Sequence, residues 1–149
     1  MNRAGEAASA VGRGLLAGAI GTAAMTASST IEMKARGREA SSAPADAAGK
    51  VLGIQPRDED GEARFSNVVH WSYGTSWGGV RGMLSAAGVD GPKAALSHFA
   101  LIWGSEQVML PSLEVAPPPW EWGVQELAID AFHHAVYVTA TAVAFSALS

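Results

Sequence analysis

The chain has 149 residues and a formal net charge of -4, and only 16% of its residues are charged, against roughly 25% in typical soluble domains. This length suits one domain, and the absence of cysteine excludes disulfide frameworks, thiolate metal sites and cysteine nucleophiles. The acidic balance, without a basic stripe carrying aromatics, argues against a nucleic-acid partner. The low charge instead indicates a membrane protein, although the mean hydropathy of +0.14 is modest because its apolar segments are rich in Ala, Gly, Ser and Thr.

The first predicted membrane helix covers about residues 11–33. No charged residue lies between Arg13 and Glu32, and a helix of this length crosses a hydrocarbon core. A secretory signal is the alternative, because Arg3 and Arg13 flank the start of the apolar run and small residues follow it. The glycines that interrupt the run suit a signal poorly.

A polar connection follows at residues 34–64 and is expected to lie outside the membrane. Within it, a short helix is predicted, with Ser42 able to cap it, Pro44 in its first turn and Gly53 at its end. The connection holds most of the Lys and Arg residues, so the positive-inside rule favours its placement in the cytoplasm.

Three more spans are predicted, at about residues 66–88, 93–112 and 123–148. The last is preceded by the segment PPPWEWG, whose prolines favour an extended path and whose Trp120 and Trp122 suit the headgroup zone.

The predicted fold class is therefore all-α. Residues 1–149 form one domain, an integral membrane bundle of four transmembrane helices in up-down-up-down order, with a long polar loop between the first two. Open sheets are excluded in lipid, because every backbone polar group must be paired within the protein. A soluble four-helix bundle is the alternative.

Small residues recur every four positions in the first two predicted spans. The glycines of these stripes, which we predict to be helix-packing residues, are Gly14, Gly18, Gly74, Gly78 and Gly82. Stripes of this kind let helix backbones approach closely in lipid. A phosphate-binding glycine loop is the alternative, but it would need a strand before the glycines and a helix after them.

Ionisable side chains inside the spans are the candidate site residues, because a charge in lipid is costly and should face a partner or a cavity. They are His70, Arg81, His98, Glu106, Asp130, His133 and His134. Counting along the helices places His70, Glu106, Asp130 and His133 in the same half of the bilayer. Asp130 and His133 share a helix face at a spacing of three residues, and His134 lies at the edge of that face.

These four residues, His70, Glu106, Asp130 and His133, are the predicted metal site. Imidazole and carboxylate groups in a bundle bind divalent metals, and histidine can also pass protons. Haem held by two histidines is an alternative that the different depths of His70 and His98 disfavour. Purely structural use of these side chains also stays open, with Asp130 at the water boundary and Arg81 extending toward the headgroups.

Four segments carry a family resemblance: GLLAGAIGT at Gly14, RGREASSAP at Arg36, HWSYGTSWGGVRG at His70 and PPPWEWGVQELAIDAFHHAVY at Pro117. Together they resemble uncharacterised bacterial four-helix inner-membrane proteins, distantly related to the YagU-like family. The resemblance implies a multi-pass protein of the bacterial inner membrane, but it supplies no reaction, ligand or catalytic residue. The chain lacks the basic C-terminal tail of the YagU-like proteins.

Two functions are expected from these patterns. The first is an accessory or scaffold component that packs with itself or with a larger membrane complex through the glycine stripes, without catalytic residues. The second is a metal-ion or proton transporter or sensor. Enzymatic activity is not expected, because no nucleophile elbow or metalloprotease motif is present.

Overall fold

A computed structural model describes residues 2–149, and in that range it contains α-helices, one 3-10 turn and no strand. The prediction of an all-α fold is confirmed. The elements are α1 (Arg3–Arg36), α2 (Ala43–Leu52), α3 (Glu59–Ala86), α4 (Gly91–Ser112), η1 (Pro119–Glu121) and α5 (Val124–Ala147).

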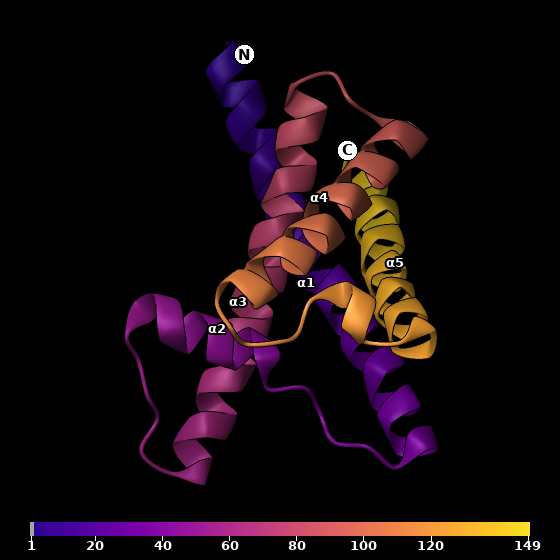
Figure 1. The fold of residues 1–149 in the computed structure, drawn as a ribbon. Helices are drawn as coiled ribbons and strands as arrows, with labels where there is room; N and C mark the ends of the chain where they lie inside the picture. The colour runs from indigo at the N-terminus through magenta and orange to yellow at the C-terminus, as the bar shows by residue number, and fades with distance from the viewer. Residues whose placement is uncertain (1) are drawn as a thin grey trace.

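The four long helices run alternately in opposite directions along the chain (Figure 1). Helix α1 makes its most extensive contacts with α3 and α5, and α4 closes the ring by packing on α3 and α5. Both termini and the α3–α4 turn lie toward one end of the bundle, whereas α2 and η1 lie toward the other (Figure 1). Helix α2 packs on α3, and Lys50 donates hydrogen bonds to the carbonyls of Leu113 and Glu114 after α4.

Local capping extends two helices beyond the predicted apolar segments. The Asn2 side chain accepts a hydrogen bond from the Gly5 amide at 2.8 Å, so α1 starts before residue 11. Asp58 accepts from the Gly61 amide at 2.7 Å and precedes an acidic first turn, so α3 starts before residue 66. Ser42 occupies the N-cap of α2, but its hydroxyl makes no capping bond.

The α1–α3 crossing is built from glycine. A Cβ on Gly18 would lie 2.6 Å from the Cα of Gly78, and one on Gly82 would lie 2.7 Å from the carbonyl carbon of Ala10. A Cβ on Gly14 would collide with the Gly78 carbonyl. The two predicted glycine stripes therefore face each other inside one chain.

The distribution of polarity is unusual for a protein in water. The buried polar or charged residues are Thr22, Arg81, His98, His133, His134 and Thr141. Large apolar side chains are exposed on every long helix, for example Leu16 (62%), Val68 (64%), Leu96 (71%) and Val143 (65%).

Two helices of the described chain, α1 and α5, are long and apolar enough to cross a membrane. The other two predicted spans correspond to α3 and α4, whose mean hydropathy is too low for them to count as candidate membrane helices by the same measure. Glycine and buried polar groups such as His98 and Arg81 lower their average.

Candidate metal centre between α4 and α5

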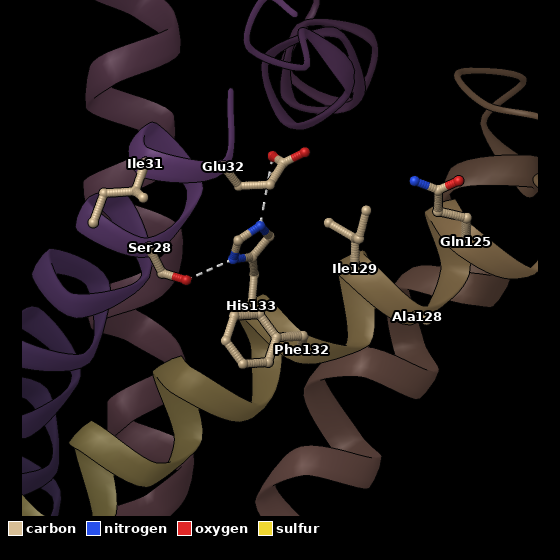
Figure 2. Close-up of a pocket in the computed structure, with 8 residues that line it drawn as sticks. All are labelled: Ser28, Ile31, Glu32, Gln125, Ala128, Ile129, Phe132 and His133. Atoms are coloured by element: carbon tan, nitrogen blue, oxygen red, sulfur yellow. Dashed lines mark hydrogen bonds and ion pairs between the residues drawn. The ribbon is translucent and has the colours of Figure 1, made fainter. Parts of the chain in front are cut away.

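Two consecutive histidines of α5 face different neighbours, because successive helix residues are about 100° apart. His133 faces α1: its Nδ1 lies 2.8 Å from Ser28 Oγ, and its Nε2 lies 3.7 Å from Glu32 Oε2 (Figure 2). His134 faces α4, where its Nε2 lies 2.8 Å from Glu106 Oε2. The two imidazoles therefore belong to separate sites.

The acid–histidine cluster consists of Glu106, Asp130 and His134. Asp130 Oδ1 lies 3.6 Å from His134 Nδ1, and the indole Nε1 of Trp103 donates to Asp130 Oδ2 at 2.8 Å. The side chain of His134 is 4% exposed, whereas those of Glu106 and Asp130 are 16% and 31% exposed. The imidazole is thus shielded while the carboxylates retain access to solvent.

The hydrogen bonds of His134 settle which nitrogen is available to a ligand. Its Nδ1 lies 2.9 Å from the backbone carbonyl of Asp130, which can only accept, so Nδ1 carries a hydrogen and donates it. Its Nε2 faces the Glu106 carboxylate, so a proton lies between these two atoms. Nε2 is consequently the atom that a cation would bind, in exchange for that proton.

The cluster has the donor set of a divalent cation site. One ligand atom from each of the three residues lies within 4.8 Å of the others. Ligands of a tetrahedral zinc lie roughly 3 to 3.6 Å apart, so modest side-chain rotation would close the site. Metal-bound histidines usually donate their second ring N–H to a carbonyl, as His134 does, and Trp103 orients Asp130 in the same way. Three protein ligands would leave a coordination position open.

The four predicted metal ligands do not converge on one point. Glu106 and Asp130 belong to the cluster, but His133 contacts α1, and His70 Nε2 lies 2.8 Å from Thr26 Oγ1. His98 is fully buried with its Nε2 2.9 Å from the carbonyl oxygen of Trp77.

The sequence-based prediction did not place His134 in the metal site, and it did not pair Trp103 with Asp130. Spacings of three and four residues both bring side chains together on a helix, and the prediction pairs Asp130 with His133 at a spacing of three. The four-residue spacing of Asp130 and His134 was the available signal. The sequence carries no signal that would have paired Trp103 with Asp130.

A hollow lies between α1 and α5, apart from the acid–histidine cluster, and has a volume of about 710 Å³. It is lined mainly by apolar side chains, including Ile31, Ile129 and Phe132, with His133 and Glu32 at one side (Figure 2).

The carboxylate of Glu32 is already engaged by two arginines. Arg36 Nη1 donates to it at 3.0 Å, and Arg38 forms a bidentate pair with it. Hydrogen bonding to Glu32 raises the pKa of the Arg38 guanidinium. Glu32 is therefore less suited to a cation than Glu106.

Comparison with known proteins gives no match to a family model, a curated protein or a solved structure. The geometry of the acid–histidine cluster therefore carries the functional assignment. Among the described residues, this cluster is the one group of at least three His, Asp or Glu side chains that lie close enough together to hold a metal ion.

Proposed function

We propose that this protein is a multi-pass protein of the bacterial inner membrane whose four long helices all cross the bilayer. The exposed Leu16, Val68, Leu96 and Val143 support this proposal. An apolar surface on every long helix is unfavourable in water, but it is the expected surface in contact with lipid tails.

The lengths of α3 and α4 also support crossing. Even the shorter, α4, has 22 residues and is about 33 Å long, which matches a hydrocarbon core of about 30 Å. Their low hydropathy has a local cause, since Arg81 and His98 point into the bundle and are 3% and 0% exposed. Polar side chains directed inward do not prevent a helix from spanning a membrane.

Within this bundle, the acid–histidine cluster binds a divalent transition-metal ion such as Zn²⁺, as part of a transporter or sensor. The observation that carries this proposal is the convergence of Glu106, Asp130 and His134 to within 4.8 Å. Two carboxylates outweigh one imidazolium, so the cluster attracts a cation. Asp130 lies about two turns from the start of α5, so ions reach it from the aqueous side where η1 lies.

An accessory or scaffold role ranks second. The Gly18 and Gly78 stripes proposed for it pack against each other within the chain. A partner helix would therefore have to contact the outward apolar sides, for example around Leu96 and Val108, which are 71% and 68% exposed.

Calorimetric titration of the full chain in detergent with Zn²⁺ tests the cation site. We expect His134→Ala to lose at least about tenfold in affinity, because it removes a direct ligand. His133→Ala is the matched control and should bind as the wild type does. Equal losses in both variants, or loss in His133→Ala alone, would contradict the assignment.

The membrane location has a separate test. Full-length protein that stays dissolved as a compact monomer without detergent would contradict it, whatever the result of the zinc titration.

A further inference from the structure

The opposite end of the bundle holds a buried arginine whose hydrogen-bonding capacity is unmet. Arg81 of α3 is 3% exposed, and its Nε and Nη1 have no partner among the described residues. Its Nη2 lies 3.7 Å from Asp90 Oδ1, longer than the roughly 2.7 to 2.9 Å of a charge-assisted hydrogen bond. Leaving such donors unpaired in a buried position is costly.

A second guanidinium lies close by. Phe145 of α5 contacts both, with Arg81 Cζ 4.2 Å and Arg13 Cζ 5.6 Å from its ring centroid. Arg13 Nε is also buried without a partner. Two cations close to one aromatic ring repel each other, and an anion between or beside them would offset this repulsion by its attraction to both.

The two arginines line a hollow of about 350 Å³. Asp90 and Gly91 also line it, so the hollow lies at the α3–α4 turn, which is at one end of the bundle in Figure 1. Ser85 and Ser146 add hydroxyl groups to its wall. The hollow also includes Gly91, the first residue of α4, but Ser85 and Ser146 lie in the last turns of α3 and α5, so the helix dipoles around the hollow oppose one another.

Charge in the hollow favours an anion. Two guanidinium groups line the hollow together with two carboxylates, that of Asp90 and that of the last residue, Ser149. Both carboxylates belong to exposed residues and are therefore strongly screened by water, whereas the guanidinium of Arg81 is buried. Guanidinium groups match the oxygens of phosphate in geometry and charge.

We propose that Arg13 and Arg81 bind a phosphate group in this hollow, carried either by a lipid headgroup or by inorganic phosphate. Arg81 supplies the buried donors, Arg13 supplies a second positive charge, and the serine hydroxyls complete the shell. Arg13 adjoins the charge-free part of α1, so the hollow lies at headgroup depth if the helices span a bilayer. The lipid source thus rests on the proposed membrane location, whereas the phosphate site itself does not, nor does it depend on the cation site.

Two titrations of the full chain in detergent test the site and separate the sources. Calorimetry with inorganic phosphate, against chloride at equal ionic strength, detects the free ion. Native mass spectrometry with phosphatidylglycerol, against diacylglycerol that lacks phosphate, detects the lipid. Binding of either phosphate compound at the arginines supports the proposal and identifies the source.

Three variants assign the binding to this hollow. Arg81→Gln and Arg13→Gln should each weaken phosphate binding by at least about tenfold, as expected for a lost hydrogen bond between charged groups. Asp90→Asn should strengthen it, because it removes an opposing negative charge while the side chain makes no capping bond. Arg64→Gln is the matched control, because Arg64 is an exposed arginine near the other end of α3, the helix that carries Arg81. It should leave phosphate binding unchanged.

Unchanged binding in Arg13→Gln and Asp90→Asn would overturn the proposal, even if Arg81→Gln fails to fold. Absence of phosphate-dependent binding in the wild type would also overturn it. Loss of zinc binding in His134→Ala with phosphate binding intact would show that the two sites are independent.

Discussion

The Tyr137 hydroxyl of α5 donates a hydrogen bond to the backbone carbonyl of Gly74 of α3 at 2.5 Å. Tyr137 is 1% exposed, so this bond lies in the centre of the bundle and joins two helices that otherwise touch little. Tyr137→Phe keeps the ring and removes the donor, so we expect a loss of about 1 kcal/mol in the free energy of unfolding. Thermal unfolding in detergent measures it. Tyr137→Ala should lose more, because it also opens a cavity, and the reverse order would contradict this account.

The glycine crossing of α1 and α3 predicts a position-dependent effect of alanine. In Gly78→Ala the new methyl group would collide with the backbone of Gly14 and Gly18, so we expect a destabilisation of about 1 to 3 kcal/mol. Gly104→Ala is the control, since a Cβ there meets nothing within 4 Å, and it should be neutral or stabilising by up to about 1 kcal/mol. Equal melting temperatures for the two variants would show that the helices do not cross as described.

The affinity of the acid–histidine cluster for a cation should increase as the pH rises. The proton between His134 Nε2 and Glu106 Oε2 must leave when a cation binds, so affinity should rise as the pH rises. Zinc titrations at two pH values, each in two buffers of different ionisation enthalpy, measure both the affinity and the proton released. Affinity that is constant or falls with rising pH would contradict the proposed exchange. Glu106→Gln should bind weakly at both pH values, because its amide oxygen is a poorer ligand than a carboxylate.

Trp103 should affect the affinity for the cation without contacting the cation itself. Trp103→Phe removes the indole N–H that donates to Asp130. It keeps an aromatic ring next to Phe99, whose ring centroid lies 5.4 Å from that of Trp103. We expect zinc affinity to fall by about tenfold with little change in stability, as for other groups that orient metal ligands. Trp120→Phe, at an 82% exposed site, is the matched control. A loss of stability without a loss of zinc affinity would show that Trp103 contributes only to packing.

Several features of the fold can be predicted from the sequence because their causes are local. A charge-free run, glycines four residues apart and helix-ending signals such as Gly53 each act within a few residues of the chain. They indicate the all-α class and the approximate positions of the helices. The helix starts at Arg3 and Glu59 differ from the prediction, because capping by Asn2 and Asp58 acts on polar sequence that hydropathy ignores.

Local sequence patterns specify the set of helices and the small and ionisable residues that each one carries. Which of these residues meet depends on how the helices pack in three dimensions. A helix fixes the angle between His133 and His134, but the packing of α5 against α1 and α4 fixes where each one points. For the same reason the glycine stripes meet each other within the chain, and Arg81 of α3 packs on Phe145 of α5. These contacts join residues distant in sequence, and they depend on the rotation of whole helices, which no local pattern specifies.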